Sequence, residues 1–400
     1  MYRILGLLIF SLASILASCT REKNNMKEIK EIIEINPNEA KDKIYLSELV
    51  DSLMYIKLQT DPNCIIGRIT KIYIKEKFIY IVDATQQVVF VFDKQGKFVS
   101  KLDKLGKGPD EYLHINHVFV ENDEKFVEII GSRGKDIKLL KYSNIKFELL
   151  DDNERMPKVS SNSCRREGDT YYYATQQIDN IVFNKSTNAS ILVSKNGEIV
   201  KELFRKKIVT NNSYFSFNSE CFTLNDKNEL FVSNMYDNTF YQLSNMNAYP
   251  IITIDFGNHG IDNSIGLKST NEQLEYLKTC RNKAFFPVLD INNSNILVFT
   301  YLFKDDLIDS GPYHFIKLKK TNKVFHTKRI INDLTSFPSE VVICTYNNLG
   351  YEAWYKDYLV EIVLPGYELK DDSGNIGKFV EGVGLIKSTD NPIIILMRLK

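Results

Sequence analysis

The sequence between residues 69 and 102 contains four short runs of β-branched and aromatic residues, and each run ends at a turn signal. These runs are Ile69 to Lys75, Phe78 to Asp83, Val88 to Asp93 and Phe98 to Leu102. Apolar runs bounded by Gly, Asn, Asp and Lys predict β-strands joined by hairpins. Four consecutive antiparallel strands of this length are typical of one blade of a β-propeller, a fold that protects its sheet edges by radial repetition.

The rest of the chain contains less regular copies of this unit. We expect five further blades, within residues 117–150, 158–204, 228–256, 288–327 and 341–399. The first strand of the third blade is predicted at Lys158 to Ser163, and the sixth blade is predicted to include Val341 to Tyr346. The sequence therefore predicts an all-β fold, a six-bladed β-propeller made of four-stranded antiparallel blades.

Two strands have no partner nearby in the sequence. Leu53 to Leu58 lies near the start of the fold, and Ile393 to Leu399 lies at its end. Pairing of these two strands would complete the last blade and close the ring, which removes two exposed edges. One helical insertion is predicted at about residues 269–284, because Ser269-Thr270-Asn271-Glu272 matches a capping box.

The N-terminus resembles an export signal. Arg3 is followed by the apolar stretch Ile4 to Ile15 and then by Leu16-Ala17-Ser18-Cys19, which is similar to the lipobox of bacterial lipoproteins. We therefore expect residues 1–18 to be a signal peptide and Cys19 to be the lipidated first residue of the mature protein. Residues 19–42 are predicted to be a polar tether, and residues 43–400 the propeller domain.

The composition argues against several classes of protein. Lys and Arg total 51 and Asp and Glu total 51, so the chain has no excess of positive charge that would attract nucleic acid. The cysteines other than Cys19 are widely spaced without a CxxC motif, so we expect neither a disulfide framework nor a zinc site. No nucleotide-binding, metalloprotease or esterase motif is present in the sequence, and we predict no cofactor.

Three features carry a family resemblance. The stretch FIYIVDATQQVVFVFDKQGKF resembles an NHL repeat, and Leu105 to Tyr112 is similar to a G-x-G-P-x-E-Y signature. Together with the lipobox, they resemble the six-bladed β-propeller lipoproteins that are abundant in Bacteroidota. The resemblance covers most of the mature chain and implies the fold, but it does not indicate an activity.

The loop from Gly106 to Tyr112 has two interpretations. Its glycines and proline allow an unusual backbone that would point Glu111 and Tyr112 toward a ligand. Alternatively, the loop locks the first blade to the second, with Glu111 bonded to backbone N–H groups and Tyr112 packed between blades. His114 and His117 are predicted to be ordinary loop and strand residues, because a separation of three on a regular strand places them on opposite faces.

Propeller ligands usually meet the face formed by the loops between blades and between second and third strands. On this position argument, the candidate ligand-binding residues are Lys107, Glu111, Tyr112, His114, Arg133, Lys135, Gln176, Gln177 and Asp305.

The functional hypothesis is a monomeric binding or scaffold protein, anchored in the outer membrane by its lipid, on the periplasmic or the cell-surface side. A glycan, a peptide or an envelope protein would be its partner. The alternative is a propeller enzyme, a hydrolase, lactonase or lyase, that uses channel carboxylates with or without a divalent cation. No catalytic or metal-binding residue is nominated.

Overall fold

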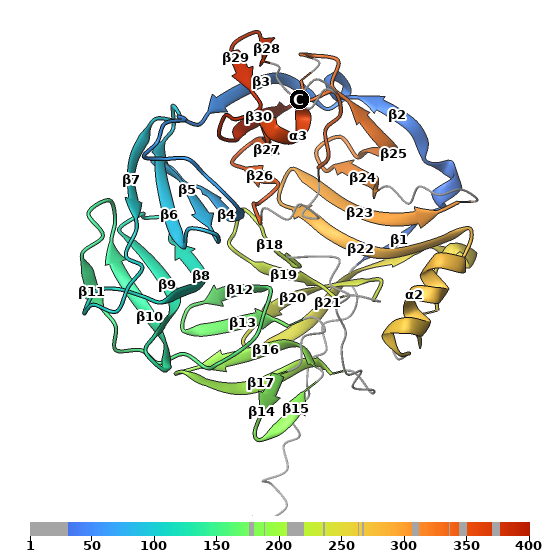
Figure 1. The fold of residues 1–400 in the computed structure, drawn as a ribbon. Helices are drawn as coiled ribbons and strands as arrows, with labels where there is room; N and C mark the ends of the chain where they lie inside the picture. Colours follow the sequence, from blue (N-terminus) through green and yellow to red (C-terminus); the bar gives the residue numbers. More distant parts are fainter. Residues whose placement is uncertain are drawn as a thin grey trace, which may run out of the picture.

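The computed structural model describes residues 31–175, 180–187, 189–205, 220–234, 237–262, 264–265, 268–305, 312–335, 337–343, 350–369 and 377–400. In this part of the chain, six four-stranded antiparallel sheets are arranged around a central axis (Figure 1). The molecule is a six-bladed β-propeller, so the predicted fold class is confirmed.

Blades 1 to 3 follow one another along the chain. Blade 1 consists of β4 (Ile69–Ile74), β5 (Phe78–Asp83), β6 (Val88–Asp93) and β7 (Phe98–Leu102). Blade 2 consists of β8 (His114–Val120), β9 (Phe126–Arg133), β10 (Asp136–Ser143) and β11 (Leu149–Asp151). Blade 3 consists of β12 (Ser163–Glu167), β13 (Thr170–Ala174), β16 (Ala189–Lys195) and β17 (Glu198–Arg205), with the hairpin β14 (Asn180–Val182) and β15 (Lys185–Thr187) inserted between β13 and β16.

Blades 4 to 6 complete the ring. Blade 4 consists of β18 (Phe222–Leu224), β19 (Leu230–Ser233), β20 (Thr239–Ser244) and β21 (Asn247–Asp255). Blade 5 consists of β22 (Lys283–Asn292), β23 (Ile296–Lys304), β24 (Pro312–Leu318) and β25 (Lys323–Ile331). Blade 6 consists of β26 (Trp354–Tyr355), β27 (Tyr358–Val363), β30 (Ile393–Leu399) and β3 (Val50–Lys57), with the hairpin β28 (Gly377–Val380) and β29 (Gly384–Lys387) inserted between β27 and β30.

The predicted ring closure is confirmed. Strand β3 pairs with β30 in antiparallel register, so that Leu53 lies opposite Met397 and Lys57 lies opposite Ile393. Side chains of β30 from Ile393 to Met397 are buried. The N-terminal strand therefore supplies the outer strand of blade 6, and the two ends of the propeller are held in one sheet.

The predicted tether was too long. Strand β1 (Glu31–Glu34) adds in parallel to the outer edge of blade 4, and β2 (Lys41–Tyr45) adds in parallel to blade 5. The 3-10 helices η1 (Pro37–Glu39) and η2 (Leu46–Glu48) lie before and after β2. Residues 31–42 thus belong to the fold, because two more edge strands find unpaired backbone there. Cys19 and the rest of the predicted tether lie outside the described residues.

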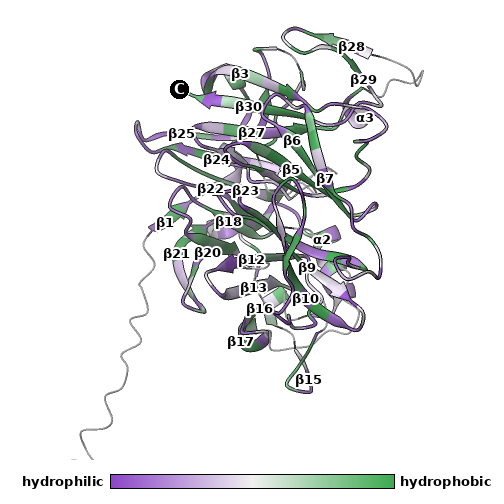
Figure 2. Cartoon of the chain, turned by 90° about the vertical axis from the view of Figure 1, so that its left-hand side faces the viewer, coloured by the Kyte–Doolittle hydropathy of each residue, from purple (hydrophilic) through white to green (hydrophobic). Residues whose placement is uncertain are grey.

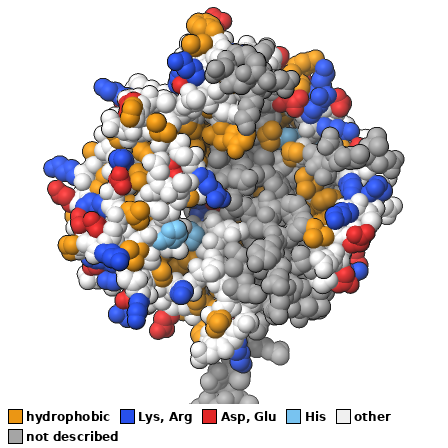
Figure 3. All heavy atoms as spheres, in the orientation of Figure 1, with side chains coloured by type: hydrophobic (Ala, Val, Ile, Leu, Met, Phe, Trp, Pro, Cys, Tyr) orange, Lys and Arg blue, Asp and Glu red, His pale blue; other side chains and the backbone are white. Residues whose placement is uncertain are grey.

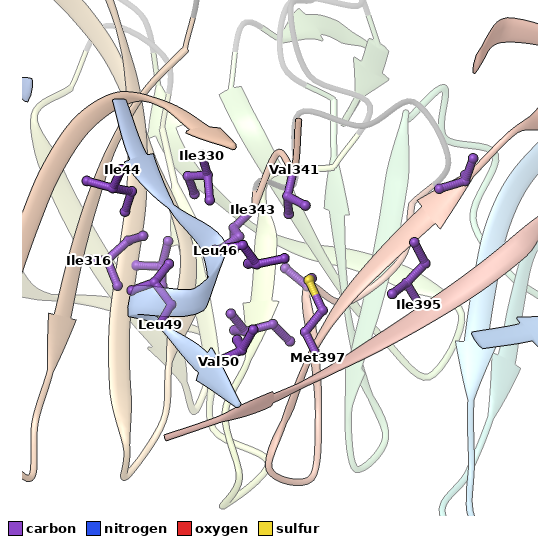
Figure 4. Close-up of a cluster of buried hydrophobic side chains, with 14 of the residues drawn as sticks. Ile44, Leu46, Leu49, Val50, Ile316, Ile330, Val341, Ile343, Ile395 and Met397 are labelled. Carbon is purple, nitrogen blue, oxygen red and sulfur yellow. The ribbon is translucent and has the colours of Figure 1, made fainter. Parts of the chain in front are cut away.

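The segment from Ile44 to Val50, which runs from the end of β2 to the start of β3, fills the junction between the last two blades. Ile44, Leu46, Leu49 and Val50 are buried in one apolar cluster with side chains of blades 5 and 6, including Met397 (Figure 4). Their burial joins the start of the propeller to its end.

Two strand predictions were wrong. The first strand of blade 3 is β12, whose Cys-Arg-Arg-Glu sequence gives no apolar pattern, whereas Lys158 to Asn162 lie in the connection before it. No strand begins at Val341. Val341 and Ile343 are buried in an irregular segment, residues 344–346 lie outside the description, and the inner strand of blade 6 is β26.

The predicted helical insertion is present. Helix α2 (Thr270–Thr279) begins with the expected capping box between Ser269 and Glu272, and it follows the 3-10 helix η3 (Gly257–His259). The helix lies at the periphery beside blade 5, away from the axis (Figure 1). The short helix α3 (Pro365–Glu368) lies in the connection of blade 6 that also contains β28 and β29.

The strand directions define two faces. We call the face formed by connections between blades and between second and third strands the upper face, and the opposite one the lower face. Both inserted hairpins, β14–β15 and β28–β29, lie on the upper face. The fourth strand of a blade runs toward the upper face, and β1 is parallel to β21, so β1 begins at the lower face. Figure 2 shows β1 on one side and both hairpins on the other.

Candidate functional site

The central channel contains a cavity of about 1340 Å³. Its described lining comes from the upper ends of the inner strands and from upper-face connections of blades 1, 2, 3, 4 and 6. Figure 3 looks onto this face and shows blue and pale-blue side chains of Lys, Arg and His gathered near its centre. The cavity is larger than most sites for a single drug-sized molecule, which are about 300–1,000 Å³.

Both histidines of β8 line this cavity, contrary to our expectation. A β-bulge lies between Ile115 and His117, so His114 is opposite Ser132 while His117 is opposite Ile130. The extra residue, Asn116, changes the alternation and places both rings on one side of the strand. His114 is exposed, whereas His117 lies deeper and its ring Nε2 is 2.9 Å from Ser161 Oγ.

Two ion pairs cross the channel below the histidines. Lys71 of blade 1 binds Glu220, which lies two residues before β18 of the opposite blade 4. Arg165 of blade 3 binds Glu220 at 3.0 Å and Glu352 at 2.6 Å, and Glu352 lies two residues before β26 of the opposite blade 6. Ser163 Oγ donates to Glu220 Oε1 at 2.7 Å. Lys71, Arg165, Glu220 and Glu352 form one network, and two of its members, Lys71 and Glu220, line the floor of the cavity.

The two central members of the network, Arg165 and Glu220, are buried. Arg165 is 6% exposed and Glu220 is 3% exposed. Burial alone would raise the pKa of Glu220, but Arg165 and Lys71 outweigh it and hold the pKa at about 2. Burial lowers the pKa of His117 to about 4, with Lys71 acting in the same direction, so His117 is neutral at pH 7. At neutral pH, Glu220 is therefore an anion that does not donate protons.

Aromatic residues cross the channel below the network. Trp354 Nε1 of blade 6 donates to the carbonyl oxygen of Leu224 in blade 4 at 3.0 Å. Tyr355 Oη donates to the carbonyl oxygen of Lys75 at 3.1 Å. These contacts connect blades 1, 4 and 6 near the lower end of the inner strands, so a ligand would reach the cavity from the upper face.

The geometry of the loop after blade 1 matches the second interpretation, in which the loop locks blade 1 to blade 2. Glu111 Oε2 accepts from Gly108 N at 2.6 Å, and a Cβ at Gly106 would lie 2.0 Å from the same oxygen. Tyr112 is fully buried between blades 1 and 2, and its hydroxyl donates to the carbonyl oxygen of Gln87 at 2.7 Å. Neither residue lines the described cavity.

The other nominated residues do not converge either. Arg133 pairs with Asp152 and with the carbonyl oxygen of Pro109, and Asp305 lies 3.8 Å from Lys328. Lys107 and Lys135 are exposed outside the described lining. Gln176 and Gln177 lie outside the described residues. Of the nominated residues that the structure describes, His114 alone lines the cavity.

The sequence analysis missed the residues that form the cavity floor. Glu220 lies two residues before β18, and Arg165, which binds it, lies on the unpredicted inner strand β12. Lys71 interrupts the apolar run of β4, and a charged residue at such a position is the only sequence signal that points to a polar channel.

The described residues offer limited catalytic chemistry. No three His, Cys, Asp or Glu side chains among them are close enough to hold a metal ion. The cavity carboxylates are Asp83, Glu220 and Asp390, and each is bonded to protein donors. The three carboxylates of the described lining are therefore engaged by other groups of the protein.

The fold and the cavity define the class of the molecule, a six-bladed β-propeller with a polar central site on its upper face. The chain belongs to the family described as a domain of unknown function (DUF4934), which matches residues 30–398. The comparison with curated proteins gave no match.

Two solved structures share the fold. A Bacteroides fragilis protein inferred to be exported is 17% identical, with a TM-score of 0.65 over 92% of this chain and 99% of that one. A member of the DUF4221 family from Bacteroides vulgatus is 9% identical, with a TM-score of 0.51 over 88% and 97% of the two chains. No helix in the described part of the chain has the length and apolar character needed to cross a bilayer.

Proposed function

We propose that the protein is an exported lipoprotein that binds a ligand in the cavity on its upper face. The observation that carries this proposal is the cavity itself, with polar and charged residues of five blades directed at one space. The lipobox at Cys19 supports export and anchoring, as does the likeness in fold to a Bacteroides fragilis protein inferred to be exported. The ligand is a glycan, a peptide or a segment of an envelope protein.

The direction of β1 supports this role. Because β1 begins at the lower face, the chain that leads back to Cys19 leaves the propeller on the side opposite the cavity. Twelve positions separate Cys19 from Glu31 in the sequence. A lipid on Cys19 would therefore anchor the lower face and leave the cavity directed away from the membrane.

Two experiments test the proposal. Incorporation of labelled palmitate into the full chain, compared with Cys19→Ser, tests the anchor; equal labelling of both would refute it. Arrays of glycans and peptides probed with the soluble propeller test binding. Loss of the bound probe in a cavity variant such as Asn116→Trp, with an unchanged melting temperature, is the expected result. Binding that is insensitive to this variant would place the site elsewhere.

A further inference from the structure

The acidic and the basic side chains that line the cavity differ in whether other groups of the protein already bind them. Among the described lining residues, three carboxylates face the cavity, and each is already bonded to the protein. Asp83 accepts from the backbone N–H groups of Gly67, Thr85 and Gln86 at 2.6 to 3.0 Å. Asp390 pairs with Lys57 at 2.7 Å and accepts from Lys387 N at 3.0 Å.

The third carboxylate, Glu220, is shared by Lys71, Arg165 and Ser163 on the cavity floor. Carboxylates with their lone pairs occupied by close donors have little capacity left for a ligand. The carboxylates of the described lining are therefore already engaged in hydrogen bonds and ion pairs within the protein.

Two basic side chains remain available. Arg68 is exposed, lines the cavity, and its guanidinium makes no hydrogen bond or ion pair with any residue that the structure describes. The same holds for the exposed ring of His114, within the same described ranges. Figure 3 shows blue and pale-blue side chains near the centre of this face. An arginine with free donors at a partly enclosed site is suited to a carboxylate or sulfate, which it binds with two parallel hydrogen bonds.

We infer that the cavity recognises an acidic glycan through Arg68, a specificity that rests on the proposed function. Uncharged groups of the same cavity lining suit sugar hydroxyls: Asn116 and Thr389 are exposed lining residues with hydrogen-bonding side chains. Tyr367, 76% exposed, adds an aromatic ring against which the C–H face of a sugar can pack.

A glycan fits these observations better than an acidic peptide. Most apolar lining residues, such as Ile69, Ile115 and Val118, are buried in the blades. They leave few apolar pockets for peptide side chains, which usually supply much of the specificity of peptide recognition. The recognised groups are then an oxyanion at Arg68 and hydroxyls at amide and hydroxyl side chains elsewhere in the cavity lining.

Titration calorimetry of the soluble propeller tests this inference. The probes are oligogalacturonate, which carries carboxylates, chondroitin sulfate oligosaccharides, which add sulfates, neutral galactooligosaccharides and poly-glutamate. We expect one of the two acidic glycans to bind, with the comparison between them separating carboxylate from sulfate. Binding should weaken as salt rises. Arg68→Gln should weaken it about tenfold or more, the effect of losing a charge-assisted hydrogen bond.

Lys107→Gln is the matched control, because Lys107 is an exposed cation of the same face outside the described lining. It should leave the affinity unchanged, and both variants should melt like the wild type. An equal loss in both variants, tighter binding of poly-glutamate, or the absence of acidic-glycan binding would overturn the inference. If neutral sugars or peptides bind, and Asn116→Trp abolishes that binding, the cavity is a ligand site but its proposed specificity for acidic glycans is overturned.

Discussion

Replacement of Glu220 by glutamine tests whether the ion pairs across the channel hold the ring together. Glu220 is buried, and it is the carboxylate shared by Lys71 and Arg165. Its pKa of about 2 lies below the ordinary value of 4.5, a difference that corresponds to about 3 kcal/mol of stability. Breaking a buried ion pair from one side costs about 3–5 kcal/mol, which agrees in size. We therefore expect Glu220→Gln to lower the free energy of unfolding at pH 7 by about 3 kcal/mol.

Urea unfolding followed by tryptophan fluorescence measures this loss. The chain has one tryptophan, and Trp354 lies in the channel below the network, so it reports on the affected region. Glu76→Gln is the control, because Glu76 pairs with Lys356 on the surface at 2.6 Å.

The pH dependence supplies a second readout. A carboxyl whose pKa is lowered by folding stabilises the protein above its unfolded pKa, and this stability is lost as the pH falls through the folded value. The difference between wild type and Glu220→Gln should be full above about pH 4.5 and should shrink toward pH 2. Equal unfolding midpoints at pH 7, or a difference that does not change with pH, would refute the reasoning.

Three further predictions concern the stability of the ring. Deletion of residues 393–400 removes five buried apolar residues at about 1.5–3 kcal/mol each, a total comparable with the whole stability of a domain, so no cooperative melt is expected; a wild-type melt would contradict the observed closure. A chain that begins at Leu46 lacks β1 and β2 and should melt several degrees below a chain that begins at Glu31, since Ile35 and Ile44 are then lost from the core; equal melting temperatures would show that these strands add nothing. Burial raises the pKa of Glu361 to about 8, so wild-type stability should fall as the pH rises from about 4.5 to 8, by up to about 5 kcal/mol, whereas Glu361→Gln should not show this fall; parallel pH profiles of the two proteins in chemical unfolding would contradict this prediction.

The strands of blade 1 could be predicted almost to the residue because their pattern is local. Val88 to Asp93 and Phe98 to Leu102 are apolar runs separated by turn residues, and their partners are the next strands in sequence. The capping box at Ser269 is local in the same way. Ring closure involves distant strands, but two apolar strands without neighbours had only each other as partners.

The cavity could not be predicted in this way, because its residues meet only in the ring. Lys71, Arg165, Glu220 and Glu352 come from four blades, and nothing in the sequence around each of them indicates the other three. The inner strands that carry them are short or charged, so the apolar pattern that marks a strand is weakest where the channel is lined.

The bulge at Asn116 shows the same limit on a smaller scale. Counting alternate residues along β8 separates His114 from His117, whereas one extra residue in the ladder brings them to one side. The sequence by itself determined the six-bladed fold, most of the strands and the ring closure, while anchoring through Cys19 stays a prediction. Only the tertiary structure decided which charges are paired across the channel and which, such as Arg68, are left to face it, because ion pairing depends on distances between blades.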